Sequence, residues 1–404
     1  MIELTAKGSN NSYYSIMIIL LIAYALVYFH RTMTGIMKPE VDEFSRYYGI
    51  NANILLSTMS SAYFYAYATS QLITGPLLDS YGVKRIGATM LAVLSLGTIL
   101  MLLKNEFGLI VGRTLIGFAA AVAFLSYMRS SSLYFSKSMQ AKLTSFAIMI
   151  GNFSTIVSTY PLRIFLQRFG YTTTLLILAS ISSLLSYLVF KKSSDVGSIE
   201  KTSKLRERFA EMKKIASEKH IWGVGIAALA GYGTSIAYQA TWGQRNLTEM
   251  FGFSIEKASI MLMIIAITAT IFSPIVGFIS DNVIKRRKPI LISTPLSSLI
   301  GWFLIYISFY LHNSILLYAS MISLGLSIAL QIVAPVMARE EVQSKYSGTA
   351  TAMFNVQVFF GIAILQTISG FLSISSMIIV SIGVSLFGIL ASILFTRETY
   401  KPSL

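Results

Sequence analysis

Three arginines stand inside long apolar stretches of the chain, at Arg31, Arg113 and Arg129. An arginine at the centre of a membrane helix costs about 2.5–3.5 kcal/mol on insertion scales, so it is expected to face protein or water and to have a role. Its planar guanidinium presents a fork of N–H donors that fits a carboxylate or a phosphate. Arginines in these positions therefore indicate the binding of negatively charged groups.

Arg31, within AYALVYFHRTMTG, lies too deep in its stretch to reach the cytoplasmic interface easily. We take it as the best candidate for holding a negatively charged solute; the alternative is a structural arginine bonded to backbone carbonyls. His30 points about 100° away on a helix and is assigned to packing or to the interface. Arg129 is included in the predicted binding set, although its side chain could instead reach the cytoplasmic headgroups.

Uncharged polar and aromatic residues within the apolar stretches could complete a binding site. For each of them, a hydrogen bond between helices is the alternative role. Together they describe a cavity that is polar, aromatic and poor in acid. The set consists of Tyr63, Tyr67, Asn152, Tyr238, Gln239, Gln331 and Asn355.

The 17 acidic residues fall in loops, in tails or at the ends of the apolar stretches. Proton symport usually needs a carboxylate or histidine that titrates within the membrane, and His30 is the one such residue in mid-stretch. Exchange or facilitated movement is therefore favoured over proton coupling. Three scattered histidines and no cysteine predict no metal site and no cofactor, and no motif of an enzyme is present.

Composition indicates a membrane protein. The chain is 54% hydrophobic and 12% charged, whereas soluble domains carry about 25% charged residues. Its net charge of +15 raises the possibility of nucleic-acid binding, but the basic residues lie between apolar stretches rather than along one face. Basic loops facing the cytoplasm explain the charge better, and no nucleic-acid partner is predicted.

The apolar stretches predict an all-α membrane protein with twelve transmembrane helices in two six-helix, pseudo-symmetric bundles. Each stretch is long enough to cross the hydrocarbon as a helix. They are Tyr14–Ile36, Ala52–Leu78, Ile86–Leu103, Phe107–Arg129, Lys142–Leu162, Thr172–Phe190, Ile221–Gly243, Lys257–Ser280, Pro289–Phe309, Ser314–Val336, Tyr346–Gly370 and Ser375–Phe395.

The predicted bundles are residues 1–190 and 221–404, joined by a polar cytoplasmic linker at 191–220. Most lysines and arginines fall on the side of the membrane that also holds both termini, which places the termini in the cytoplasm. We expect a monomer in the plasma membrane whose partners are the lipid bilayer and a small-molecule substrate.

Two short polar segments mark the tandem design. GPLLDSYGVKR at Gly75–Arg85 and GFISDNVIKRRK at Gly277–Lys288 share a glycine, an aspartate four residues later and a basic cluster. Gly75 and Gly277 lie 202 residues apart, which is half of the 404-residue chain. Such an offset predicts two repeats of like design. Asp79 and Asp281 are predicted to hold the halves in one of two states, and an ordinary anchored loop is the alternative.

These features resemble the Major Facilitator Superfamily. Its signature in the loop after the second span is roughly G-x-L-x-D-R-x-G-R-K/R. Ser80 replaces an arginine of this pattern, and Arg113 in GRTLIGF matches an arginine of the fourth span; the residues that match the signature are Gly75, Leu77, Asp79, Gly82, Lys84 and Arg85. The resemblance implies alternating access between two halves. It assigns a conformational, gating role to Gly75, Asp79, Gly82, Lys84, Arg85, Arg113, Gly277, Asp281 and Arg286.

The first span, YFHRTMTGIMKP, also resembles that of the organophosphate antiporters in the superfamily. Those carriers use a second arginine in the seventh span, where this chain has no basic residue before Arg245 at the outer end. The glycine–proline motif of drug–proton antiporters is absent from the fifth span, which keeps only Gly151 and Pro161. We therefore predict a secondary transporter of a small organic anion or zwitterion, such as a carboxylate or a short peptide. A non-transporting sensor with the same fold and a proton-coupled exporter are the alternatives.

Overall fold

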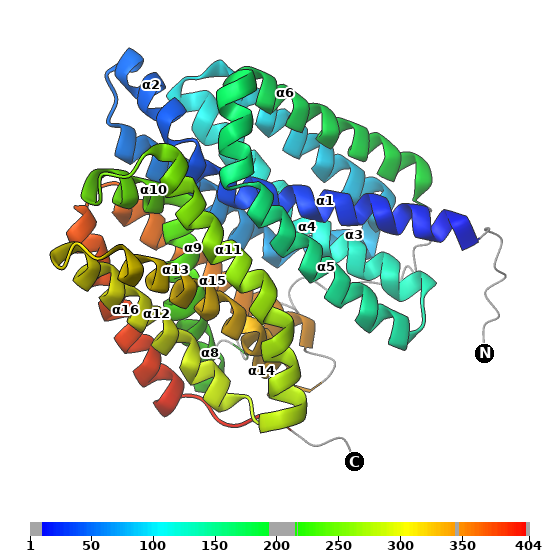
Figure 1. The fold of residues 1–404 in the computed structure, drawn as a ribbon. Coiled ribbons are helices and arrows are strands. Elements are labelled where there is room, and N and C mark those ends of the chain that lie inside the picture. The colour runs from blue at the N-terminus through cyan, green and yellow to red at the C-terminus, as the bar shows by residue number, and fades with distance from the viewer. Residues whose placement is uncertain (1–9, 194–214, 216, 344–346, 401–404) are drawn as a thin grey trace.

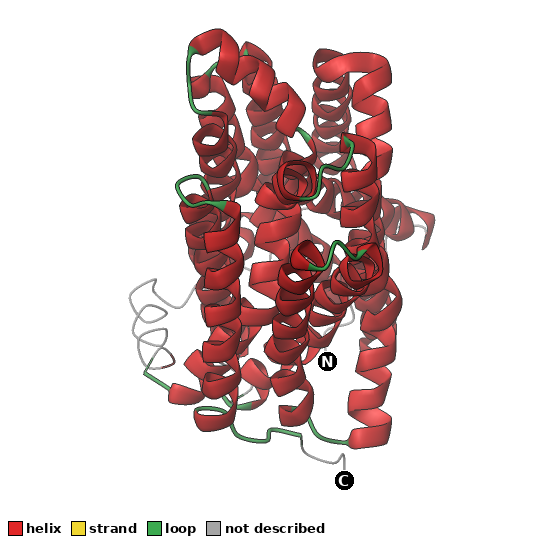
Figure 2. Ribbon diagram, turned by 60° about the vertical axis from the view of Figure 1, so that its left-hand side comes forward, coloured by secondary structure: helices red, strands yellow, loops and turns green. Residues whose placement is uncertain are grey.

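The structure is a computed structural model that describes residues 10–193, 215, 217–343 and 347–400. All regular elements in these ranges are helical, which confirms the predicted all-α class. Most of the long helices run side by side, with short loops at their ends (Figure 2). Most of the predicted linker at 191–220 lies outside the described residues.

The first part of the chain forms six α-helices and one short 3₁₀ turn. They are α1 (Asn10–Ile36), α2 (Lys38–Tyr48), α3 (Ala52–Leu100), η1 (Met101–Leu103), α4 (Glu106–Tyr134), α5 (Lys137–Val157) and α6 (Tyr160–Lys192). In Figure 1 these helices lie together, beside the group formed by the second part of the chain.

The second part contains more irregular helix. Its elements are α8 (Lys219–Ala228), η2 (Leu229–Gly233), α9 (Thr234–Ala237), η3 (Tyr238–Trp242), α10 (Gly243–Arg245), η4 (Asn246–Met250), α11 (Ile255–Phe278), η5 (Ile279–Ile284), α12 (Lys288–Tyr310), α13 (Ser314–Leu330), η6 (Gln331–Val333), α14 (Ala334–Glu340), α15 (Ser347–Ser369) and α16 (Ile374–Leu394). Their order along the chain can be followed by colour in Figure 1.

Ten helices among the described residues are long and apolar enough to cross a membrane. The two other predicted spans are helical as well: Ala52–Leu78 is the first part of α3, and Lys142–Leu162 is divided between α5 and α6. The protein is thus an integral membrane protein, while the number of twelve crossings and the pseudo-symmetry of the halves remain predictions.

The predicted turn at Gly75–Arg85 is wrong in its extent. The helix α3 continues through Gly75 to Ser80 and breaks only at Gly82, whose φ of 77° and ψ of 169° lie in a region that favours glycine. Gly170 breaks α6 in the same way, with φ 78° and ψ 167°. A single glycine at each break is sufficient to reverse the chain direction between two long helices.

Asparagine side chains fix where several helices begin. The Asn51 side chain accepts hydrogen bonds from the backbone N–H groups of Asn53 and Ile54 at the start of α3, at 3.0 and 3.2 Å. Asn105 does the same for α4, accepting from the N–H of Gly108 at 2.8 Å. These caps satisfy N–H groups that have no partner within the helix.

Small residues bring α3 and α4 close together. A Cβ atom at Gly97 would lie 2.6 Å from the carbonyl oxygen of Gly112, and a Cβ atom at Gly112 would lie 2.5 Å from the carbonyl oxygen of Gly97. The two backbones therefore touch where each helix presents a glycine, as is common between membrane helices.

The seventh predicted span, Ile221–Gly243, is longer and less regular than expected. Helical residues continue from Lys219 to Met250, and three π-helical segments, η2, η3 and η4, interrupt it. Almost all of its side chains are buried. Because π-segments are rare and often occur at functional sites, this helix is a natural place to look for one.

Candidate functional site

Arg31 of α1 is buried among tyrosines and has 8% of its surface exposed. Its Cζ atom lies 4.0 Å from the ring centroid of Tyr28, one turn earlier on the same helix, and 6.0 Å from that of Tyr232 in η2. Tyr63 and Tyr67 of α3 are the next groups that act on it electrostatically. The guanidinium therefore faces protein rather than lipid.

A phenylalanine closes this arrangement from the second half of the chain. The ring of Phe359 in α15 lies 4.7 Å from the ring of Tyr67 and 6.4 Å from the ring of Tyr232, edge to face in both pairs. We call Tyr28, Tyr63, Tyr67, Tyr232 and Phe359 the aromatic cage of Arg31. Residues from both halves thus surround one cation.

The charge of Arg31 has no acidic partner among the residues that the structure describes. Its strongest electrostatic neighbours are all tyrosines, and its Nε atom is buried without a hydrogen-bond partner. Contacts with ring faces contribute about 0.5–2 kcal/mol each, which is less than the several kcal/mol that burying an ion costs. An anion placed beside the guanidinium would supply both the missing charge and the missing acceptor.

Arg113 of α4 is fully buried and bonded to backbone. Its Nη1 donates to the carbonyl oxygen of His30 at 2.7 Å, and its Nε donates to that of Met59 at 3.4 Å. Its Cζ lies 4.6 Å from the ring centroid of Tyr63. Arg113 therefore joins α4 to the backbone of α1 and α3, next to Tyr63 of α3. Its role in gating stays a prediction.

Two predicted substrate residues are engaged elsewhere. The Tyr238 hydroxyl donates to Oδ1 of Asn246 at 2.8 Å, and its ring packs 5.4 Å from that of Trp302. Nε2 of Gln239 donates to the carbonyl oxygen of Leu262 at 3.0 Å. Both side chains join helices of the second half, which is the alternative role considered for them above.

The remaining predicted substrate residues are spread over the molecule. Nδ2 of Asn355 lies 3.5 Å from Oε1 of Gln71, so this pair joins α15 to α3. Gln331 is half-buried at the start of η6. Arg129 lines a separate cavity of about 410 Å³ between α3 and α4, together with Gly75. None of these three contributes to the aromatic cage.

A cleft of about 790 Å³ separates the two halves at one end of the molecule. Its walls are the first turns of α5 and the last turns of α11, with η6 and η5 between them, and most of the lining is apolar. Asn152, another predicted substrate residue, lies in this wall. The principal lining residues are Phe146, Met149, Asn152, Ser273, Phe278 and Val333.

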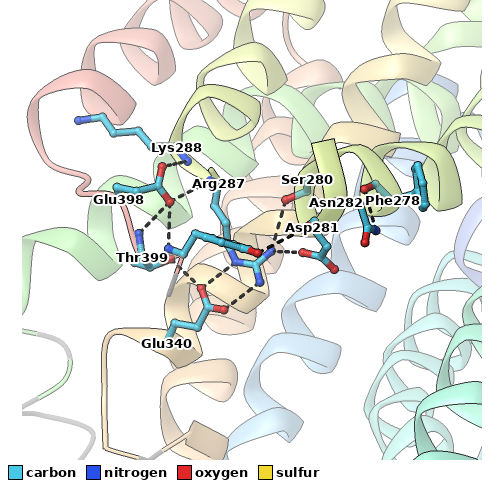
Figure 3. A network of polar contacts seen from close by, with 10 residues as sticks. Phe278, Ser280, Asp281, Asn282, Arg287, Lys288, Glu340, Glu398 and Thr399 are labelled. Atoms are coloured by element: carbon cyan, nitrogen blue, oxygen red, sulfur yellow. Dashed lines mark hydrogen bonds and ion pairs between the residues drawn. The ribbon is translucent and has the colours of Figure 1, made fainter. Parts of the chain in front are cut away.

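The second signature segment forms an ion-pair network at the same end (Figure 3). Nη1 of Arg287 lies 2.9 Å from Oδ1 of Asp281, while its Nε and Nη2 donate to the two carboxylate oxygens of Glu340 at 2.8 and 2.9 Å. Arg286 itself is exposed, and the next residue makes the ion pairs, so the gating role of Arg286 stays a prediction.

The C-terminal segment is fastened to this network. The Glu398 carboxylate accepts hydrogen bonds from the backbone N–H groups of Arg287 and Lys288, at 2.9 and 3.1 Å, and Thr399 donates to Glu340 at 2.7 Å. Partial burial acts to raise the pKa of Glu398, but these and two further backbone N–H groups hold that pKa below its ordinary value. Burial acts to lower the pKa of Arg287, but the Glu340 and Asp281 carboxylates raise that pKa above its ordinary value.

The first signature segment is less fully described. The side chain of Asp79 lies outside the described part of the chain, Arg85 is exposed, and Lys84 places its Nζ atom 5.2 Å from the ring centroid of Phe190. In the second copy, a Cβ atom at Gly277 would meet no atom within 4 Å. Gly277 therefore lines the cleft instead of allowing a close helix contact.

The two halves touch at the end opposite to the cleft. Nζ of Lys38, in α2, lies 3.6 Å from Oε1 of Glu249 in η4, and Gln167 of α6 donates to Glu256 in the first turn of α11. The same helix α11 thus contacts the first half at its start and borders the cleft at its end. The structure is closed at one end and open at the other.

Backbone contact tightens the closed end. A Cβ atom at Gly35, near the end of α1, would lie 2.7 Å from the carbonyl oxygen of Gln239 in η3. Ser60 of α3 donates to the neighbouring Ala240 carbonyl at 3.4 Å. Helices α1 and α3 therefore pack directly on a π-helical segment of the second half.

A family model described as Major Facilitator Superfamily matches the sequence over residues 20–365 and 247–404. The chain belongs to this superfamily. The resemblance seen in the signature segments is thereby confirmed.

Three curated relatives show distant similarity. The "Uncharacterized transporter YybO" of Bacillus subtilis is 22% identical, over 65% of this chain and 64% of its own length. The "Probable sulfoacetate transporter SauU" of Cupriavidus necator is 21% identical, over 85% and 83%. The "Probable anion transporter 2, chloroplastic" of Oryza sativa subsp. japonica is 26% identical, over 48% and 39%. The chain thus spans just under two thirds of the first relative's length.

Solved structures share the fold. The crystal structure of a D-xylose–proton symporter has a TM-score of 0.74 at 15% identity and covers 97% of this chain and 99% of its own. The crystal structure of a mutant of the nucleoside transporter NupG has a TM-score of 0.71 at 15% identity and covers 94% and 100%. At this level of identity the similarity concerns the fold alone.

Proposed function

We propose that this protein is a secondary transporter that moves a small organic anion or zwitterion by alternating access, with Arg31 as the residue that holds the negative charge. The observation that carries the proposal is a buried guanidinium with no acidic partner among the described residues, set in an aromatic cage to which both halves contribute. The names of two relatives, an anion transporter and a sulfoacetate transporter, favour the same class of solute.

The geometry supports a simple cycle. Arg31, Tyr28, Tyr63 and Tyr67 belong to the first half, while Tyr232 and Phe359 belong to the second. A solute bound in the cage contacts both halves, so its binding energy depends on their relative position. This dependence is what allows a ligand to shift an equilibrium between two states.

We assign the open end to the cytoplasm and the closed end to the outside. The bias of basic residues supports this assignment, with both termini in the cytoplasm and the protein in the plasma membrane as a monomer. The halves correspond to residues 1–190 and 221–404. Under this assignment the structure represents an inward-facing state, and the Arg287 network belongs to the cytoplasmic gate.

The proposal is tested by uptake into proteoliposomes from a library of carboxylates, sulfonates and amino acids. Hydrogen bonds to charged groups contribute about 1.5–3 kcal/mol, so Arg31→Gln is expected to weaken the apparent affinity for an accepted solute by about 10- to 100-fold. The matched control is Arg46→Gln, which removes an exposed arginine from α2 and should leave uptake unchanged. If Arg31→Gln took up every accepted solute as the unaltered protein does, Arg31 would not be the residue that holds the negative charge.

A further inference from the structure

The cage around Arg31 also determines what charge the solute carries. Resting on the transport function proposed above, we infer that the preferred substrate bears a single negative charge, on a carboxylate or sulfonate group, and that the rest of the molecule is uncharged. The sequence predicts an anion or a zwitterion and does not distinguish monoanions from dianions. Three features of the site lead to it.

The first feature is that one cation is presented to the cage. Arg31 is buried but keeps 8% of its surface accessible, and its Nε has no hydrogen-bond partner. Arg113 is fully buried with its Cζ over the Tyr63 ring; two of its nitrogens donate to backbone carbonyls, and its Nη2 is enclosed without a partner. A second carboxylate or sulfonate on the solute would therefore meet aromatic rings, and an unpaired charge in such a place is costly.

The second feature is the lack of a site for a positive group. No ion pair of Arg31 or Arg113 occurs among the residues described, and the cage residues are all tyrosine or phenylalanine. Aromatic faces can bind an ammonium group, but three of these rings already lie under a guanidinium: Arg31 lies over Tyr28 and Tyr232, and Arg113 lies over Tyr63. A zwitterion would bring its ammonium group close to two guanidinium groups of like charge.

The third feature is an unused hydroxyl group. The Tyr63 hydroxyl is buried and has no hydrogen-bond partner, and its ring is stacked on Tyr67 with centroids 6.1 Å apart. A hydroxyl group can donate to an anion's oxygen beside the Arg31 guanidinium. One cation with a neighbouring neutral donor fits one carboxylate or sulfonate, and the rings fit an uncharged remainder.

The test compares probes that differ in charge and little else. Isethionate, sulfoacetate and taurine are two-carbon sulfonates with one negative charge, two negative charges and no net charge. Lactate, malonate and alanine form the equivalent carboxylate series. In competition for uptake of the strongest Arg31-dependent solute, each monoanion should be effective at about tenfold lower concentration than its two analogues, since a mispaired charge costs at least about 1.4 kcal/mol.

The outcomes are distinguishable. If no solute depends on Arg31, the proposed function fails. If Arg31-dependent binding exists but a dianion or a zwitterion binds as tightly as its matched monoanion, the charge inference fails and the transport function stands. If all six probes are inactive, the charge of the strongest Arg31-dependent solute decides: one negative charge supports the inference, and any other charge overturns it.

A charge added to the cage provides the converse experiment. Phe359→Lys places a second cation beside Tyr67 and Tyr232, and it should improve competition by the dianion relative to the monoanion by about tenfold. Phe359→Met is the matched control because it keeps the position uncharged and flexible. Both proteins are first checked for a monodisperse profile in detergent. An unchanged ratio in folded Phe359→Lys would contradict the inference.

Discussion

At the scale of single residues, the site consists of one buried cation whose partners are mostly neutral. Arg31 is held by ring faces rather than by carboxylates, so its charge remains available to a ligand. Arg113, the other fully buried guanidinium, is satisfied largely by backbone carbonyls. Both guanidinium groups lie over tyrosine rings, and they differ in that Arg113 also donates to two backbone carbonyls.

The Tyr63 hydroxyl provides a prediction at this scale. Tyr63→Phe keeps the ring on which Arg113 is placed but removes the donor, so affinity for the anion should fall about three- to tenfold, in line with about 1 kcal/mol for a neutral hydrogen bond. Thermal stability should change little, because the removed hydroxyl has no partner in the folded protein. Competition assays measure the affinity.

Tyr187→Phe serves as the control, since Tyr187 is 57% exposed on α6. If Tyr63→Phe bound the anion as tightly as the unaltered protein, Tyr63 would be a packing residue only.

The sequence predicts Arg31, Tyr63 and Tyr67 of this arrangement, but not Tyr28, Tyr232 and Phe359. Arg31 is conspicuous because a guanidinium in mid-span is rare. Tyr28 could have been found one helical turn before it. Tyr232 and Phe359 depend on how two halves of the chain meet, and no local pattern reports that. The sequence instead favours Tyr238 and Gln239 as substrate residues. Both lie in the π-helical η3, and their side chains bond to other residues of the second half.

At the scale of elements, glycine positions decide where helices approach each other. The signature glycines Gly75 and Gly277 are prominent in the sequence, but a close backbone approach between the halves involves Gly35 against η3. Gly82 is predicted to lie within a turn, and in the structure α3 breaks at this residue alone. The sequence does not tell whether Arg286 or Arg287 makes the ion pairs, because in a short irregular segment neighbouring side chains point in different directions.

Gly35→Ala tests the contact between α1 and η3. The added Cβ would lie 2.7 Å from the Gln239 carbonyl, and overpacking of this kind costs about 1–3 kcal/mol. Thermal stability in detergent should fall, and transport should slow because the closed outer end can no longer form fully. Gly383→Ala in α16 is the control, since open space surrounds its Cβ; replacing that glycine should stabilise the helix slightly. Equal stability of the two variants would show that the contact is not tight.

At the scale of the whole molecule, contacts join the two halves at one end and a cleft separates them at the other. Gln167 and Glu256 touch across the closed end, while Ser145 and Gly277 line the cleft from different halves. If the halves rock, these two pairs should approach and separate in turn.

The chain contains no cysteine, so paired cysteines can be introduced without background. The pair Gln167→Cys with Glu256→Cys should be joined by a short, reducible thiol-reactive cross-linker in the inward-facing state, which stops transport until the linker is reduced. The pair Ser145→Cys with Gly277→Cys should be joined only when the cleft closes. Free movement of solute in both cross-linked proteins would contradict alternating access.

The most direct measurement of the central claim is equilibrium binding of the strongest transported anion to the unaltered protein and to folded Arg31→Gln in detergent. The account predicts saturable binding that weakens by about 10- to 100-fold in the variant, with no comparable loss in Arg46→Gln. The same dissociation constant in all three proteins would show that the negative charge is held elsewhere.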